Sequence, residues 1–438
     1  MSLRNANLLF LLGVLIVPSV LARGAAPELV VGDTRYRGGI SEDGAVSHFL
    51  GVPFAAAPVG PLRWEPPRPL RSSAGVREAR RFAPACYQGP HMVNWYRGVV
   101  QSFGGDPDVV VAPEFSEDCL YLNVWAPLAR SAEPWPVMVY VHGGSNKGGW
   151  AYEPNYIGEN LARRGVIVVS VAYRLGALGF FSHPQLGQSN FALLDLVAAL
   201  RWVAGNIASV GGDPANVTLF GESAGANNIA HLIAVPAAQG LFRRVIHQSG
   251  GWAINGRGSR SEHLEAGRLL QQTLAPGGGI DDLRETSPDR LLSAVSEVYD
   301  GHFFDPVVDG HSLIEPVADT FARGNFAAVD MLIGSNRDEW LMYLEEGATV
   351  QEWLRENVAP QRGVEVLAQL PPAAGELQRL DRLITATEYV CPSMRLAEAV
   401  RRRGGRSWFY LFNRQREGEQ AATMGAYHGA ELPYVFDT

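Results

Sequence analysis

Residues 216–234 read Asn-Val-Thr-Leu-Phe-Gly-Glu-Ser-Ala-Gly-Ala-Asn-Asn-Ile-Ala-His-Leu-Ile-Ala, and the fold class is inferred first from this segment. Asn216–Phe220 predicts a buried strand, and Ala224–Ala234 predicts a helix that begins almost at once. The turn between them, Gly221-Glu-Ser-Ala-Gly225, has a glycine two residues to either side of Ser223. Such glycines remove side chains that would clash where a serine lies at a sharp strand-to-helix turn. The alternative is a tight structural turn, but the flanking strand and helix favour Ser223 as a nucleophile.

Strands alternate with helices on both sides of this turn. Strands that are buried on both faces and alternate with helices indicate an α/β fold with a mostly parallel central sheet. The polar region from Glu262 to Asp300 predicts an inserted helical cap or surface helices. The predicted strands are residues 136–141, 166–173, 216–220, 244–248, 328–333 and 407–412, and the predicted helices are residues 155–164, 191–209 and 224–234.

A nucleophilic serine needs a base and an acid, which in such a sheet follow the serine in chain order. His428 lies beyond the last predicted strand and beside a glycine, so it is the best candidate among the ten histidines. The segment Ser335-Asn-Arg-Asp-Glu339 follows the strand that ends near Gly334, and it offers two carboxylates. The local sequence does not choose between Asp338 and Glu339.

The glycine-rich segment His142-Gly-Gly-Ser-Asn-Lys-Gly-Gly149 follows another predicted strand. Its free amides, together with the amide of Ala224 at a helix N-terminus, can face a developing oxyanion. A loop of this kind could instead hold phosphate. However, the chain has neither a GxxxxGK[ST] nor a GxGxxG pattern, so nucleotide binding is disfavoured.

Length, composition and charge restrict the class of protein. The chain has 438 residues, of which 47% are hydrophobic and 19% charged, so it can bury a large core. Its formal net charge is −8 and it has no basic run, which argues against nucleic acid as a partner. No internal repeat or low-complexity linker divides residues 27–438, which we expect to form a single catalytic domain.

The N-terminus has the pattern of an export signal, with Arg4 before the apolar run 8–17 and small residues for cleavage after residue 22 or 26. The alternative is an uncleaved anchor, but the run is short for a bilayer span. We therefore expect a secreted or periplasmic protein without stable membrane insertion. Cys86 and Cys119, 33 positions apart, are expected to form a disulfide that leaves Cys391 free; the alternative is three reduced thiols.

Together these residues resemble the type-B carboxylesterase and cholinesterase family of α/β-hydrolases over nearly all of the chain after the signal segment. The resemblance implies Ser223 as nucleophile, Glu339 as acid, His428 as base, oxyanion amides from Gly144, Ser145 and Ala224, and the Cys86–Cys119 bridge. It implies an α/β-hydrolase fold and hydrolysis of a small-molecule ester without a metal or organic cofactor. Ser249 is a candidate to support Glu339, and the alternative is a buried structural serine. The matching blocks are 51–64, 116–123, 141–144, 173–176, 211–214, 221–225, 248–250, 336–339 and 427–431.

Three residues depart from the family pattern. Ser145 stands where a third glycine is usual, Asn146 where an aromatic residue is usual, and Trp340 where a glycine follows the acid. The chain also stops ten residues after His428, where family members continue with further helices, so we expect a C-terminally truncated sequence. An exported serine carboxylesterase is the favoured function, and a non-catalytic cholinesterase-like binding or adhesion module is the alternative.

Overall fold

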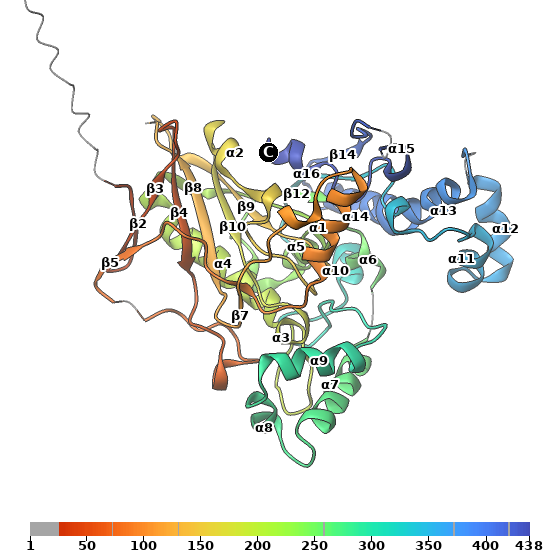
Figure 1. Cartoon of the computed structure of the whole chain (residues 1–438), viewed down its shortest axis with the longest axis horizontal. Coiled ribbons are helices and arrows are strands. Elements are labelled where there is room, and N and C mark those ends of the chain that lie inside the picture. Colours follow the sequence, from red (N-terminus) through yellow and green to blue (C-terminus); the bar gives the residue numbers. More distant parts are fainter. Residues whose placement is uncertain (1–25, 72, 130, 257–258, 371–372, 419–420) are drawn as a thin grey trace, which may run out of the picture.

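The computed structural model describes residues 26–438 except 72, 130, 257–258, 371–372 and 419–420 (Figure 1). The predicted export signal lies almost entirely outside the described residues and stays a prediction. Among the described residues, one helical segment, Phe191–Val210, is long and apolar enough to cross a membrane, with a mean hydropathy of 1.5. Most of that segment is buried inside the protein, as is usual for a core helix.

The described part of the chain has a nine-stranded central sheet with the order β14-β13-β12-β11-β9-β10-β8-β4-β3. The strands from β14 to β10 in this order run parallel, while β8, β4 and β3 pair antiparallel at one edge. This confirms the predicted mostly parallel sheet. The strands are β3 Gly39–Ile40, β4 Val46–Pro53, β8 Tyr121–Pro127, β9 Trp135–Val141, β10 Ile167–Val171, β11 Gly212–Glu222, β12 Arg244–Gln248, β13 Asp330–Asn336 and β14 Ser407–Phe412.

Smaller elements and helices surround this sheet (Figure 1). Strands β1 Glu28–Val31, β2 Thr34–Arg37 and β5 Gly75–Glu78 form a second sheet, and β6 Ala85–Cys86 pairs with β7 Phe115–Ser116. The helices are α1 His91–Ser102, α2 Glu159–Arg163, α3 Gly176–Gly179, α4 Phe191–Asn206, α5 Ala224–Ala234, α6 Trp252–Asn255, α7 Arg260–Leu274, α8 Ile280–Arg284, α9 Pro288–Val298, α10 Val317–Arg323, α11 Val350–Asn357, α12 Pro360–Gln369, α13 Glu376–Ile384, α14 Cys391–Arg402, α15 Ala421–Met424 and α16 Leu432–Phe436.

Both faces of the central sheet are buried, because alternate side chains of a strand enter different apolar clusters. On β9, Val137 and Val139 join the large cluster that includes side chains of α4 and α5. Their neighbour Tyr140 joins a second cluster with Phe220 of β11 and Phe436 of α16. Helices therefore cover both faces of the sheet. The candidate site lies at the carboxyl ends of the parallel strands.

The predicted helix 155–164 was too long. The structure has a 3₁₀ turn at Pro154–Tyr156 and the shorter helix α2, which begins after Gly158. A Cβ atom at Gly158 would lie 2.7 Å from atoms of both Trp125 and Val168, so this backbone packs directly on the sheet. The predicted cap of residues 262–300 is confirmed as helical, since α7, α8 and α9 gather at one end of the molecule (Figure 1).

The predicted disulfide is confirmed: Cys86 and Cys119 are bonded with a Cα–Cα distance of 4.9 Å, and Cys391 is free and exposed. The bridge closes the segment that contains α1. Side chains of α1 pack into a small aromatic cluster with Trp150, which follows the glycine-rich loop. The bridge thus ties α1 to the sheet close to the predicted oxyanion loop.

We expect the double change Cys86→Ala with Cys119→Ala to lower the free energy of unfolding by about 3 to 4 kcal/mol. In the chain-entropy model, a crosslink that closes a loop of 33 residues removes that much freedom from the unfolded chain. Urea unfolding followed by circular dichroism measures the change. Cys391→Ala, at the exposed free thiol, is the control and should stay within about 0.5 kcal/mol of the parent. Equal losses in the two variants would contradict a stabilising role for the bridge.

Candidate active site

Ser223 lies at the sharp turn between β11 and α5, as the sequence predicted. Its backbone has φ 57° and ψ −124°, a conformation that non-glycine residues rarely adopt. A Cβ atom at Gly221 or Gly225 would lie 2.6 Å or 2.0 Å from the carbonyl oxygen of Val141 on the neighbouring strand. Both positions therefore require glycine, and the turn presents the Ser223 hydroxyl above the carboxyl end of the sheet.

The structure brings the predicted base and one predicted acid to this hydroxyl. The distance from His428 Nε2 to Ser223 Oγ is 2.8 Å, and that from His428 Nδ1 to Glu339 Oε2 is 2.7 Å. Glu339 lies in the turn after β13 and His428 in the segment after β14, so loops at the same edge of the sheet supply all three groups. This is the geometry in which a histidine can take a proton from a serine while a carboxylate orients the ring.

The tertiary structure distinguishes the two carboxylates, Asp338 and Glu339, between which the sequence did not choose. Glu339 is fully buried, and its Oε1 accepts a 2.7 Å hydrogen bond from the amide of Asn336 while its Oε2 meets His428. Asp338 points elsewhere: it pairs with Arg337 at 2.6 Å and accepts a 2.7 Å hydrogen bond from the Ala426 amide. Asp338 therefore braces the segment that carries His428, and Glu339 contacts the imidazole itself.

A second carboxylate, Glu222, faces the same imidazole and was not singled out from the sequence. Its Oε1 lies 3.1 Å from His428 Nε2. Burial raises the pKa of Glu222 above that of an ordinary carboxyl group. Burial alone would lower the pKa of His428, but the nearby carboxylates of Glu222 and Glu339 outweigh it and raise that pKa. Its position directly before Ser223 in the turn was the available signal.

The predicted oxyanion residues lie around Ser223. Gly144, Ser145 and Ala224 all line the cavity that contains Ser223. Among the described residues, their backbone amides donate no hydrogen bond, and a first helical residue such as Ala224 has no acceptor within its own helix. Ser145 has φ 56°, so the loop places serine in the left-handed region where glycine is usual.

Asn146, noted in the sequence only as a departure, anchors this loop. It is fully buried and has φ 56°, which asparagine tolerates better than most residues. Its Nδ2 donates a 2.7 Å hydrogen bond to the carbonyl of Phe304, and its Oδ1 accepts one of 2.8 Å from Asn228 on α5. An aromatic residue could make neither bond, so the loop is held here by hydrogen bonds to the helix that follows Ser223.

Of the two roles considered for Ser249, the hydrogen bonding agrees with the buried structural serine and, in the described part of the chain, shows no bond to Glu339. The Ser249 hydroxyl is buried and has no hydrogen-bond partner among the described residues. Only its amide bonds to the next strand, to the carbonyl of Gly334 at 2.9 Å. The carboxylate of Glu339 is held instead by the Asn336 amide, because the turn after β13 folds that amide back toward it.

The cavity beside Ser223 has a volume of about 250 Å³ and a largely aromatic wall. Trp340, another departure, lies in this wall, and its amide donates a 2.7 Å hydrogen bond to Asp381. Trp95 of α1 reaches across from the disulfide-closed segment and donates a 2.9 Å hydrogen bond to the Tyr343 hydroxyl. The aromatic lining residues are Trp95, Tyr96, Tyr156, Trp252, Phe303, Trp340 and Tyr343.

No group of three or more histidine, cysteine or acidic side chains suited to hold a metal ion occurs in the described part of the chain. The groups that the structure places at the cavity are thus a serine, an imidazole, buried carboxylates and free amides. This set can perform nucleophilic attack on a carbonyl group with acid–base transfer of one proton.

Known proteins that are similar to this chain are esterases. The model of the Carboxylesterase family matches residues 30–359. Fumonisin B1 esterase of Sphingopyxis macrogoltabida is 36% identical, over 98% of this chain and 78% of the relative. Para-nitrobenzyl esterase of Bacillus subtilis (strain 168) is 34% identical, over 91% of this chain and 80% of the relative. A solved structure of PNB esterase is 30% identical to this chain and has a TM-score of 0.80. The match covers 94% of this chain and 83% of the PNB esterase chain. A thermophilic PNB esterase gives the same TM-score and identity.

Proposed function

This chain belongs to the carboxylesterase family, has its α/β-hydrolase fold and is a carboxylic ester hydrolase, and from that premise we propose that it works through an acyl-enzyme on Ser223. In this proposal His428 is the general base and Glu339 orients it. The amides of Gly144, Ser145 and Ala224 hold the oxyanion. The observation that carries the proposal is the continuous chain of short hydrogen bonds from Ser223 through His428 to Glu339.

In the first half of the reaction, Ser223 Oγ attacks the ester carbonyl carbon and its proton passes to His428 Nε2. Negative charge then develops on the carbonyl oxygen, where the free amides stabilise it. The bond to the alkoxy oxygen breaks, and the proton on Nε2 passes to the leaving alcohol. The acyl group is then esterified to Ser223.

In the second half, water attacks the acyl carbonyl and gives a proton to His428 Nε2. The tetrahedral intermediate collapses, the carboxylic acid departs, and Ser223 Oγ recovers its proton. Throughout, the Glu339 carboxylate accepts the hydrogen bond of Nδ1–H and stabilises the imidazolium that forms transiently. These steps use only groups of the chain and one water molecule.

A fluorophosphonate probe tests this proposal against a non-catalytic binding module of the same fold. Because Ser223 has a base within hydrogen-bond distance, we expect stoichiometric labelling, with the modified peptide containing residue 223. Labelling should abolish hydrolysis of p-nitrophenyl butyrate in parallel. Absence of both labelling and hydrolysis by folded protein would favour the binding module, and labelling at another serine would displace Ser223.

The carboxylates around His428 predict an unusual pH profile. A general base must be unprotonated, so a raised pKa moves the acid limb of kcat/KM to higher pH than an ordinary histidine near pH 6.5 would give. Glu222→Gln removes one of the charges that raise this pKa, and we expect the limb to move to lower pH. The profile is measured with p-nitrophenyl butyrate from pH 5 to 9. An unchanged limb, or one at higher pH, would show that Glu222 does not set the pKa of His428.

Export is a further part of the proposal. It is supported by the charged and apolar pattern before residue 26 and by the Cys86–Cys119 bridge, because disulfides persist mainly in oxidising compartments. The ester substrate would then be met in the periplasm or outside the cell.

A further inference from the structure

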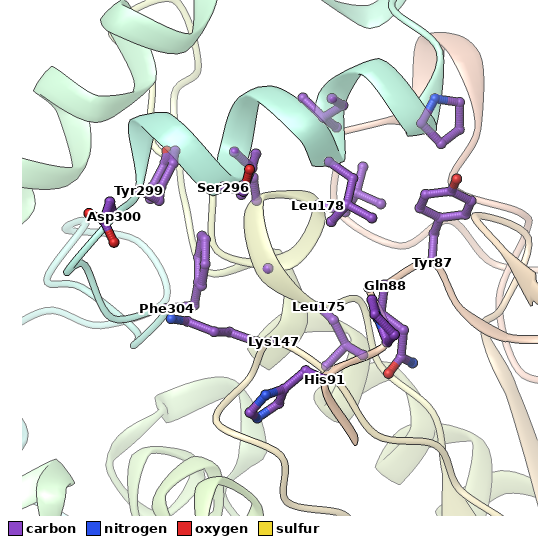
Figure 2. Close-up of a pocket in the computed structure, with 18 of the residues that line it drawn as sticks. Tyr87, Gln88, His91, Lys147, Leu175, Leu178, Ser296, Tyr299, Asp300 and Phe304 are labelled. Carbon is purple, nitrogen blue, oxygen red and sulfur yellow. The ribbon is translucent and has the colours of Figure 1, made fainter. Parts of the chain in front are cut away.

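Figure 2 shows a second cavity, which we name the Lys147 cavity. The cavity that contains Ser223 is called the catalytic cavity below. The volume of the Lys147 cavity is about 450 Å³, against about 250 Å³ for the catalytic cavity, and the side chain of His91 lines both. The segment 303–305 also borders both: Phe303 and Asp305 line the catalytic cavity, and Phe304 lines the Lys147 cavity. The two spaces are therefore neighbours that share a wall.

The wall of the Lys147 cavity is mainly apolar. Leu291 and Val295 of α9 line it together with Leu175 and Leu178. Figure 2 shows Ser296 and Tyr299 on one side of the space, with Lys147 and His91 across from them. Such a lining suits an alkyl chain or ring, and it gives a charged group at its border few partners.

Lys147 is the only lysine in the chain, and it places a positively charged side chain in the wall of this cavity. Among the described residues, no carboxylate lies within 4 Å of its ammonium group, and Asp300, which also lines the cavity, does not pair with it. The contact that its Nζ does make is with the Phe304 ring, whose centroid is 5.9 Å away. Partial burial and the nearby Lys147 charge lower the pKa of His91.

The backbone links this ammonium group to the proposed oxyanion site. The amide of Lys147 donates a 3.0 Å hydrogen bond to the carbonyl of Gly144, which closes a tight turn through Ser145 and Asn146. Asn146 is held to Phe304 and α5, so the turn has a defined position relative to Ser223. When the carbonyl group of a substrate lies against this turn, the Lys147 ammonium group therefore lies at a fixed position beyond that carbonyl group.

We propose that the Lys147 cavity binds a carboxylate carried by the ester substrate, on the part of the substrate that extends from the catalytic cavity. The apolar wall holds the chain between ester and carboxylate, and the Lys147 ammonium pairs with the carboxylate. This assignment rests on the proposed function, since it names the class of ester that the Ser223 site prefers. The carboxylate can belong to the acyl group or to the alcohol.

Matched pairs of esters test the proposal. On the acyl side, the mono-p-nitrophenyl esters of adipic, pimelic and suberic acids are compared with p-nitrophenyl hexanoate, heptanoate and octanoate. On the alcohol side, 6-butyryloxyhexanoate is compared with hexyl butyrate. Lys147→Gln should lower kcat/KM for the preferred anionic ester about ten- to thirtyfold more than for its neutral partner, because a charge-assisted pair is lost. Lys147→Arg should keep most of the preference.

Arg402→Gln is the matched control for loss of one positive charge. Arg402 lies on α14, its side chain is 58% exposed, and it is not among the residues that line either cavity. We expect this variant to leave the ratio of anionic to neutral ester unchanged. An equal fall with Arg402→Gln would mean that only the net charge of the protein matters, and would overturn the assignment.

A binding measurement separates failure of this inference from failure of the proposed function. In the Ser223→Ala background, calorimetry compares the p-nitroanilides of adipic and hexanoic acid, with and without Lys147→Gln. Tighter binding of the adipic compound that is lost with Lys147→Gln supports the cavity even if no ester is hydrolysed. The other outcome is that neutral esters are cleaved, but Lys147→Gln lowers kcat/KM for no anionic ester more than for its neutral partner, whether the carboxylate is on the acyl or the alcohol group. The Lys147 cavity then does not bind a carboxylate, while the proposed esterase mechanism is unaffected.

Discussion

Ser223→Ala should lower kcat/KM for p-nitrophenyl butyrate by about 10⁵- to 10⁶-fold while the protein stays folded. In the proposed mechanism the change removes the atom that forms the acyl-enzyme, and removing the serine of such a set costs nearly as much as removing the whole set. The fold should tolerate it because His428 Nε2 keeps a neighbour, Glu222 Oε1, at 3.1 Å. Steady-state kinetics and thermal unfolding by circular dichroism measure the two effects.

The chain offers a closely matched control in Ser249. It follows β12 as Ser223 follows β11, it is buried, and it too has a positive φ, 53° against 57°. Its hydroxyl has no hydrogen-bond partner among the described residues, so Ser249→Ala should change kcat/KM by less than about threefold. Ser223 would not be the nucleophile if Ser223→Ala kept activity within tenfold of the parent. The same conclusion would follow if Ser249→Ala lost as much activity as Ser223→Ala.

Glu339→Gln should lower kcat by about 10³- to 10⁴-fold. The Gln amide would donate to His428 Nδ1 where the carboxylate now accepts, which forces the ring proton onto Nε2. In that tautomer Nε2 cannot take the Ser223 proton. The side chains have the same shape, and the Asn336 amide keeps an acceptor, so the loss should fall on kcat and much less on stability.

The neighbouring change Asp338→Asn is the comparison. Asp338 bonds to Arg337 and to the amide of Ala426, and its carboxylate makes no hydrogen bond to the imidazole of His428 among the described residues. Its loss should cost about 1 to 3 kcal/mol of stability, with kcat within about tenfold of the parent. If Asp338→Asn lowered kcat more than Glu339→Gln, the acid role would move to Asp338.

The order of elements and the position of the sharp turn at Ser223 followed from local features of the sequence. Alternating apolar strands and helices predicted the parallel sheet, and two glycines around Ser223 predicted the turn. Three predicted elements, α5, β12 and β14, match to the residue. These features are readable because each reflects a constraint within a few residues: burial on both faces, helical spacing, or the clash that a Cβ atom at Gly221 or Gly225 would cause.

The contacts between distant segments could be read only from the folded chain. Whether Asp338 or Glu339 meets His428 depends on how the turn after β13 folds against a segment about 90 residues later, and both side chains carry the same charge. The same holds for Asn146, whose bonds to Phe304 and Asn228 span 158 and 82 positions, and for Ser249, whose hydroxyl misses Glu339. A hydrogen bond requires atoms to be placed correctly to within a few tenths of an ångström. The residue type determines which partners a side chain can bind, but the packing of the whole chain determines which partner it meets.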